Sequence, residues 1–146
     1  MIKKLILAIL VILCGMAQAQ LRPFYSTASN KYGYVGSEGK IAVQPKYDFA
    51  REFREGMSPV KLNGKYGYVN EKGIEVITPK YDHAWMFSDG LSVVKIGDKY
   101  GFIDKSGKLV VPAIYDRADN FHGDRANVRV GKKWEVMIYP QLIKRP

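Results

Sequence analysis

The chain has 146 residues, of which 47% are hydrophobic and 25% are charged, and its formal net charge is +9. This composition is ordinary for a folded domain and too apolar for a disordered chain. The length allows a single domain and the sequence holds one cysteine, so a multidomain enzyme, a polytopic membrane protein and a disulfide scaffold are excluded as classes.

The first residues have the pattern of a secretory signal peptide. Lys3 and Lys4 give a positive start, an unbroken apolar run covers residues 5–13, and small residues precede the expected cleavage point. The run is too short to span a bilayer comfortably, so we expect cleavage after Ala19 rather than a retained anchor. The mature protein is then periplasmic or secreted and has no transmembrane segment.

Cys14 leaves one alternative open, because lipoproteins are also cut before a cysteine that then carries lipid. The residue before it is Leu13, where that signal usually has a small residue. A chain cut after Ala19 holds no cysteine, so disulfides, cysteine nucleophiles and thiolate metal sites are excluded for it. Such an exported chain has to be stabilised by core packing.

A period of 34 residues relates most of the chain, which indicates a repeat architecture. The segment KYGYV at 65–69 recurs 34 residues earlier and, as KYGFI, 34 residues later; the fourth copy, 133–137, has lost the glycine. The same step relates tyrosine–aspartate pairs and phenylalanines further along each copy. The recurring positions that we expect to serve the fold are Tyr32, Gly33, Tyr66, Gly67, Tyr100, Gly101, Trp134, Asp48, Asp82 and Asp116.

Each copy is predicted to form three short strands, because aromatic and β-branched runs alternate with glycine-containing turns. In the third copy these are 91–96, 99–103 and 108–111, the last ended by Pro112. The Tyr-Asp-x-Ala-x-x-Phe segment that follows, here called the return segment, predicts one helical turn with the aspartate as its N-cap. The expected fold is all-β: tandem three-stranded repeats stacked as an open, twisted, solenoid-like array.

A two-residue turn joins the first and second strands of each copy and fixes the register of the hairpin. This register sets a cation beside an aromatic ring, a contact worth about 0.5–1 kcal/mol when exposed. The predicted pairs are Lys61–Tyr66, Lys95–Tyr100 and Arg129–Trp134. The glycine in the middle of each second strand is costly there, so we expect close approach by something bulky, such as a ring of the return segment.

These elements, in this order and spacing, resemble the WG repeat: Lys-aromatic-Gly-aromatic-Val/Ile, a polar turn ending in Gly, a short apolar strand near Pro, Tyr-Asp-x-Ala-x-x-Phe and a Gly-Leu-x-Val-Val strand. The resemblance covers residues 31 to about 139 and is clearest at 65–98. Tyrosine replaces the signature tryptophan in three copies, and Trp134 lacks the glycine. The resemblance implies a bacterial, often exported, non-catalytic module that binds or scaffolds.

The expected organisation follows from the leader and the repeats. It comprises a signal peptide (1–19), a capping strand (20–30), three copies with a partial fourth (31–139) and a C-terminal tail (140–146). Four hairpins leave two sheet edges, so self-association through those edges is a further expectation.

Residues that do not recur in every copy are the better candidates for function. A catalytic group is needed only once, whereas a residue that recurs in each copy usually serves the fold. We therefore expect no enzyme activity, no cofactor and no metal site. The candidate partner-binding residues are Lys61, Lys95, Arg129, Trp85 and His122. Their cations form a positive stripe suited to a protein or an anionic envelope polymer such as a glycan; the alternative is that they cover rings and protect sheet surfaces. Export argues against nucleic acid as the partner.

Two further groups leave alternatives open. Asp119 and His122 are three residues apart, which permits a weak metal or proton-transfer site; we favour loop residues held by salt bridges. Trp85 and Met86, next to His83, are expected to pack on the neighbouring copy.

Overall fold

The computed structural model describes residues 20–139, so the predicted signal peptide with Cys14 and the predicted tail lie outside the described residues. The 3₁₀ turn η1 (Ser37–Gly39) is the one helical segment in this range, and none of the range forms a helix long and apolar enough to cross a bilayer. The strands are β1 (Arg22–Ser26), β2 (Lys31–Val35), β3 (Ile41–Tyr47), β4 (Phe49–Ala50), β5 (Met57–Leu62), β6 (Lys65–Asn70), β7 (Glu75–Tyr81), β8 (His83–Ala84), β9 (Leu91–Ile96), β10 (Lys99–Asp104), β11 (Leu109–Tyr115), β12 (Arg117–Ala118), β13 (Arg125–Val130) and β14 (Lys133–Ile138).

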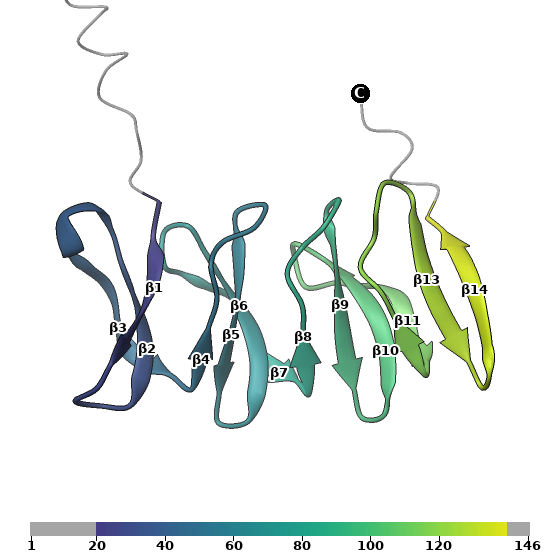
Figure 1. Cartoon of the computed structure of the whole chain (residues 1–146), viewed down its shortest axis with the longest axis horizontal. Helices are drawn as coiled ribbons and strands as arrows, with labels where there is room; N and C mark the ends of the chain where they lie inside the picture. The colour runs from purple at the N-terminus through teal and green to yellow at the C-terminus, as the bar shows by residue number, and fades with distance from the viewer. Residues whose placement is uncertain (1–19, 140–146) are drawn as a thin grey trace, which may run out of the picture.

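The strands form four antiparallel sheets that follow one another in chain order along the molecule (Figure 1). We number them sheets 1 to 4: β1-β2-β3, β4-β5-β6-β7, β8-β9-β10-β11 and β12-β13-β14. Within a complete sheet, a hairpin is flanked by a short strand from the return segment and by a third long strand. Among the described residues, sheet 1 lacks the short strand and sheet 4 lacks the third. The all-β expectation is confirmed.

The hairpin registers are as predicted. Lys95 faces Tyr100 in sheet 3, and the equivalent residues face each other in sheets 2 and 4. Gly97 and Gly131 have φ of 60°, a conformation that two-residue hairpin turns require and that glycine adopts without strain. A local signal in the turn therefore sets the pairing of the hairpins in sheets 2, 3 and 4, whereas the hairpin of sheet 1 pairs Ser26 with Lys31 across a four-residue loop.

The third strand does not end at its proline, so this prediction was wrong. β11 continues through Pro112 as far as Tyr115, and β3 and β7 likewise contain their prolines. The register with β10 shifts between the pairs Phe102–Val111 and Tyr100–Tyr115, which marks a bulge. A residue at a bulge does not have to donate to the ladder, so proline is tolerated there.

The glycine in each second strand is indeed closely approached, but by backbone rather than by a ring of the return segment. A Cβ on Gly67 would lie 2.3 Å from the carbonyl oxygen of Ile77 and 2.7 Å from the nitrogen of Pro79, in the bulge of β7. The corresponding distances to a carbonyl oxygen are 2.4 Å for Gly33 and 2.6 Å for Gly101. Sheet 4 has no third strand among the described residues, and there Glu135 replaces the glycine.

The helical turn predicted for the return segment is also wrong. Its first residues form the short strands β4, β8 and β12, which pair with the first strand of the next hairpin. Pairing supplies partners for the backbone; for example, the N–H of Asp82 donates to the carbonyl of Lys95 at 2.9 Å. The aspartates are therefore not helix N-caps. Asp82 Oδ2 accepts from the N–H of Gly97, at the turn of the next hairpin, at 2.7 Å.

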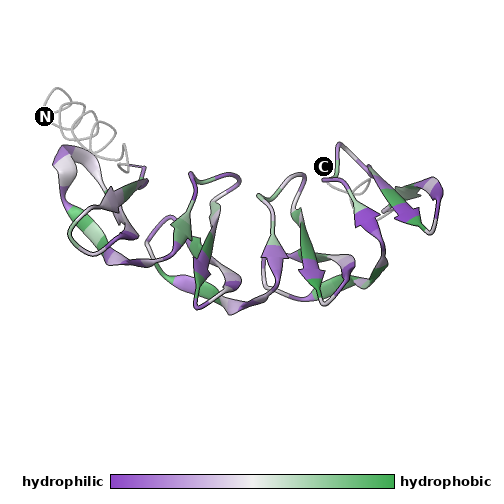
Figure 2. Ribbon diagram, turned by 60° about the horizontal axis from the view of Figure 1, so that its bottom comes forward, coloured by the Kyte–Doolittle hydropathy of each residue, from purple (hydrophilic) through white to green (hydrophobic). Residues whose placement is uncertain are grey.

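The core lies between the sheets in three clusters, each built from two successive sheets. Hydrophobic and hydrophilic stretches alternate along the ribbon (Figure 2). The buried apolar side chains of neighbouring sheets meet in these three clusters. A phenylalanine of each return segment packs on a ring in the second strand of the preceding sheet. The ring centroids are 5.2 Å apart for Phe53–Tyr34, 5.0 Å for Phe87–Tyr68 and 4.9 Å for Phe121–Phe102.

Candidate functional site

Rings from successive sheets and return segments form a continuous row on the side of the molecule near the hairpin turns. Neighbouring centroids along it are 4.1–6.3 Å apart, in tilted and edge-on arrangements. Such pairs add to the stability gained from burial alone. We define the ring row as Tyr25, Tyr32, Phe49, Tyr66, His83, Trp85 and Tyr100.

Cross-strand pairing explains how the sequence builds this row. In sheet 2, Lys61 of the first strand lies between Phe49 of the short strand and Tyr66 of the second strand. The equivalent triplets are His83–Lys95–Tyr100 in sheet 3 and Arg117–Arg129–Trp134 in sheet 4. Residues far apart in the sequence thus place one cation in the middle of each triplet.

The predicted contacts between cations and rings are present. The distances from cation to ring centroid are 5.3 Å for Lys61–Tyr66, 5.9 Å for Lys95–Tyr100 and 5.7 Å for Arg129–Trp134. Tyr66 and Tyr100 are only 9% and 8% exposed, whereas Trp134 is 51% exposed. The two lysines therefore cover their rings, and a ligand on this surface meets the cations before it meets the tyrosines.

Basic residues recur at two positions of the repeat, and we call the two sets ladders. The two ladders differ in whether their cations form ion pairs with aspartates. Lys65 forms an ion pair with Asp82, whose second oxygen accepts the turn N–H described above. The equivalent ion pairs are Lys31–Asp48 and Lys99–Asp116. Hydrogen bonding to these lysines is the first cause that lowers the pKa of each of the three aspartates. This ladder is neutralised and fastens each return segment to its hairpins.

The cations of the other ladder form no ion pair of their own, although their charges also contribute to the lowered pKa values of the same three aspartates. Lys61, Lys95 and Arg129 take part in none of the ion pairs that residues 20–139 form. We call these three cations, with the ring row, the stripe. Arg117 adds to it: its guanidinium lies 5.7 Å from the Tyr100 ring centroid and donates to the Tyr100 hydroxyl at 2.8 Å.

A shallow hollow of ≈ 280 Å³ lies on the stripe in sheet 3, lined by Asp82, His83, Trp85, Lys95 and Tyr100. His83 and Trp85 are half-buried, with centroids 4.1 Å apart. Burial lowers the pKa of His83, and the positive charges of nearby Arg51, Lys61 and Lys95 lower it further. His83 is thus a neutral ring near pH 7, and Lys95 is the cation that lines the hollow.

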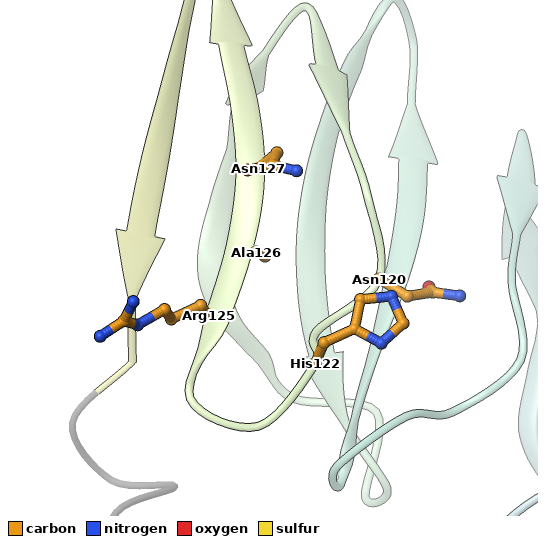
Figure 3. A pocket seen from close by; sticks show the side chains of 5 residues that line it. All are labelled: Asn120, His122, Arg125, Ala126 and Asn127. Carbon is orange, nitrogen blue, oxygen red and sulfur yellow. The ribbon is translucent and has the colours of Figure 1, made fainter.

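His122 lies away from the stripe. It lines a separate pocket of ≈ 270 Å³ in sheet 4, with Asn120, Arg125, Ala126 and Asn127 (Figure 3). Four of the five candidate residues therefore share one surface, and His122 does not. Asp119, three residues before His122, accepts from the amide of Asn127 at 3.2 Å. No group of three or more metal-ligating side chains occurs within residues 20–139.

Three residues of this surface, Phe49, Arg51 and Arg117, were not predicted from the sequence. Phe49 and Arg117 occupy the third position of Tyr-Asp-x-Ala. Because that segment was predicted to form a helical turn, these two residues were not expected to lie on a strand of the sheet. Arg51 lies 5.4 Å from the Phe49 ring centroid. The signal was present, because this position holds Phe49, His83 and Arg117, a planar side chain each time.

The repeat geometry agrees with the comparison with known families. The WG containing repeat matches residues 32–66, 66–100 and 100–134, and the chain belongs to this family. No curated protein and no solved structure matches the chain.

Proposed function

We propose that this protein is a non-catalytic module, exported to the periplasm or beyond, that binds an anionic polymer of the cell envelope, such as an acidic glycan, through the stripe. The sheets act in it as an open, solenoid-like array that offers equivalent contact points to one extended ligand. The observation that carries the proposal is the difference between the two ladders: Lys61, Lys95 and Arg129 recur outside the ion pairs of residues 20–139, while Lys31, Lys65 and Lys99 are each paired with an aspartate.

The chemistry of the stripe favours a charged, repetitive partner. Sheets 2, 3 and 4 each contribute one cation that forms no ion pair among the described residues, and half-buried Trp85 and His83 add apolar contact area beside Lys95. A single exposed cation binds weakly, but several equivalent sites on one polymer raise the overall affinity by two to four orders of magnitude, a rough range for linked sites. The net positive charge of the chain adds long-range attraction for an anion.

The test compares binding of residues 20–146 to immobilised alginate, an anionic uronate polymer, and to neutral dextran at low and physiological ionic strength. We expect salt-sensitive binding to alginate alone, abolished in Lys61→Glu/Lys95→Glu/Arg129→Glu. The matched control is Lys40→Glu/Lys72→Glu/Lys132→Glu, which makes the same charge change at exposed positions outside the stripe. Equal binding by both triple variants, or none by the unmodified protein, would refute the proposal.

A further inference from the structure

The outer edge of sheet 4 differs from the other sheet edges within residues 20–139. The edge strands of sheets 1 to 4 are β1 and β3, β4 and β7, β8 and β11, and β12 and β14. The strands β4, β8 and β12 have two residues each, β1 contains Pro23, and β3, β7 and β11 each contain a proline and a bulge. Such features keep a sheet edge from pairing with another chain. The strand β14 has none of them, because it has six residues, no proline and a regular register with β13.

The backbone of β14 directs hydrogen-bonding groups toward this edge. The N–H of Tyr139 donates to the carbonyl of Asp124 at 2.9 Å, so the backbone groups of Tyr139 face the first strand of the hairpin. In an antiparallel ladder, successive residues direct their N–H and C=O groups to opposite sides. Trp134, Val136 and Ile138 therefore direct theirs away from β13, toward the side on which β14 is the last strand of the sheet (Figure 1).

The side chains of the same three residues are exposed. Trp134, Val136 and Ile138 are 51%, 61% and 52% exposed, and they alternate along β14, so they lie on one face of the sheet. Arg129 shares this face, because it pairs with Trp134 and its guanidinium lies over the Trp134 ring. Aromatic and β-branched side chains pack well against a neighbouring strand. The edge therefore offers both the backbone groups and the apolar side chains that an added strand would contact.

The strand that fits this edge is not a third strand of the repeat. In sheets 1 to 3, a Cβ on the mid-strand glycine would lie 2.3–2.6 Å from a carbonyl oxygen of the bulged third strand. Glu135 holds the glycine position in β14 and has a Cβ, so a bulged strand would collide with it. The occupant is therefore a straight strand. The β14 strand of a second copy is straight and has the same open edge, so a two-fold axis lets each copy supply what the other lacks.

Charge and hydrogen bonding select one register for this pairing. When Val136 lies opposite Val136 of the second copy, Trp134 lies opposite Ile138, and all the outward backbone groups of these three residues find partners. Glu135 then lies opposite Met137. A shift that sets Trp134 opposite Val136 would place the two Glu135 carboxylates directly opposite each other, which is destabilising.

We propose that two copies of this protein associate through β14, whose strands pair antiparallel about Val136 and join the two copies of sheet 4 into one continuous sheet. Residues that lie opposite each other in such a pair share a face, so Arg129 and Trp134 of both copies lie on the same face of the joined sheet. The two stripes then meet at the dimer interface. The association itself requires no ligand, so it does not depend on the proposed polymer binding.

The first test measures the mass of residues 20–146 by sedimentation equilibrium over a range of protein concentrations, without polymer. We expect a reversible monomer–dimer equilibrium. Val136→Lys should weaken it about tenfold, because two like charges then face each other and an apolar contact is lost. Val76→Lys, at another exposed valine, is the matched control and should dimerise as the unmodified protein does. Val136→Pro should be monomeric yet folded, because proline there removes only an N–H that points away from β13.

The second test examines the register by cross-linking. Residues 20–146 contain no cysteine, so Val136→Cys introduces a single thiol. We expect a short bismaleimide to join two copies of Val136→Cys and not two copies of Val76→Cys. A purely monomeric unmodified protein, equal dimerisation of Val136→Lys, or equal cross-linking of the two cysteine variants would each overturn the proposal. A monomer whose Val136 amide is protected from hydrogen exchange would show that another segment of the same chain covers the edge, which would overturn it as well.

Discussion

The hydroxyl oxygens of Tyr68 and Ser92 lie 2.8 Å apart inside the junction of sheets 2 and 3, and each is 2.8 Å from the carbonyl oxygen of Trp85. Tyr34 and Ser58 repeat the arrangement one junction earlier. At the third junction Phe102 and Ala126 hold these positions, so both hydroxyls are absent together. Burial raises the pKa of Tyr34 to about 12, which keeps that hydroxyl protonated and able to donate.

Removing both hydroxyls of this pair is expected to cost less than the sum of the two single removals. Ser92→Ala takes away a partner from a buried hydroxyl and should lower the free energy of unfolding by about 1–3 kcal/mol. Adding Tyr68→Phe reproduces the third junction and should cost less than it does alone, with a coupling of about 0.5–3 kcal/mol. Urea unfolding of the two single variants and the double variant measures this; strictly additive losses would contradict the pairing.

The mid-strand glycine is expected to tolerate no side chain. In Gly67→Ala the new Cβ would meet the backbone of β7 at 2.3 Å, and backbone cannot rotate away, so we expect a loss of about 1–3 kcal/mol in the free energy of unfolding. Gly36→Ala is the control, because the nearest atom to its Cβ is 3.7 Å away. Its unfolding midpoint should be nearly unchanged. Comparable losses in both variants would argue against the close approach.

Acid is expected to weaken the junctions through Asp48, Asp82 and Asp116. Their pKa values in the folded protein lie below the usual 3.8, so the stabilisation is present above that value and is lost as pH falls through the lowered ones. The thermal midpoint should fall more steeply below about pH 4 in the unmodified protein than in Asp82→Asn/Asp116→Asn. Identical slopes in the two proteins would contradict this role of the aspartates.

The sequence is sufficient to predict the features that depend on residues close together in the chain. Turn residues such as Gly97 set the hairpin registers, and the 34-residue period places Lys61, Lys95 and Arg129 beside rings. The return segment was mispredicted because Asp-x-Ala-x-x-Phe suits a capped helical turn equally well, and only pairing with the next hairpin decides for a strand.

The sequence alone does not show which lysines form ion pairs with aspartates. Lys65 forms an ion pair with Asp82, which is 17 residues away in the sequence. Lys61 has an acidic residue, Glu55, much nearer in the sequence, yet it forms no ion pair among the described residues. Which lysine is neutralised depends on how the return segment crosses the hairpin. That crossing follows from the strand pairing of β4 and β8, which the local pattern does not encode.

The most direct test of the stripe as a binding surface is a map of backbone amide chemical shifts of residues 20–146 during titration with an oligouronate. We expect the largest changes at Lys61, His83, Trp85 and Lys95. Residues of the paired ladder such as Lys65 should change little. Changes that fall mainly elsewhere, or no saturable changes at all, would contradict the central claim that the unpaired cations and their rings form the binding surface.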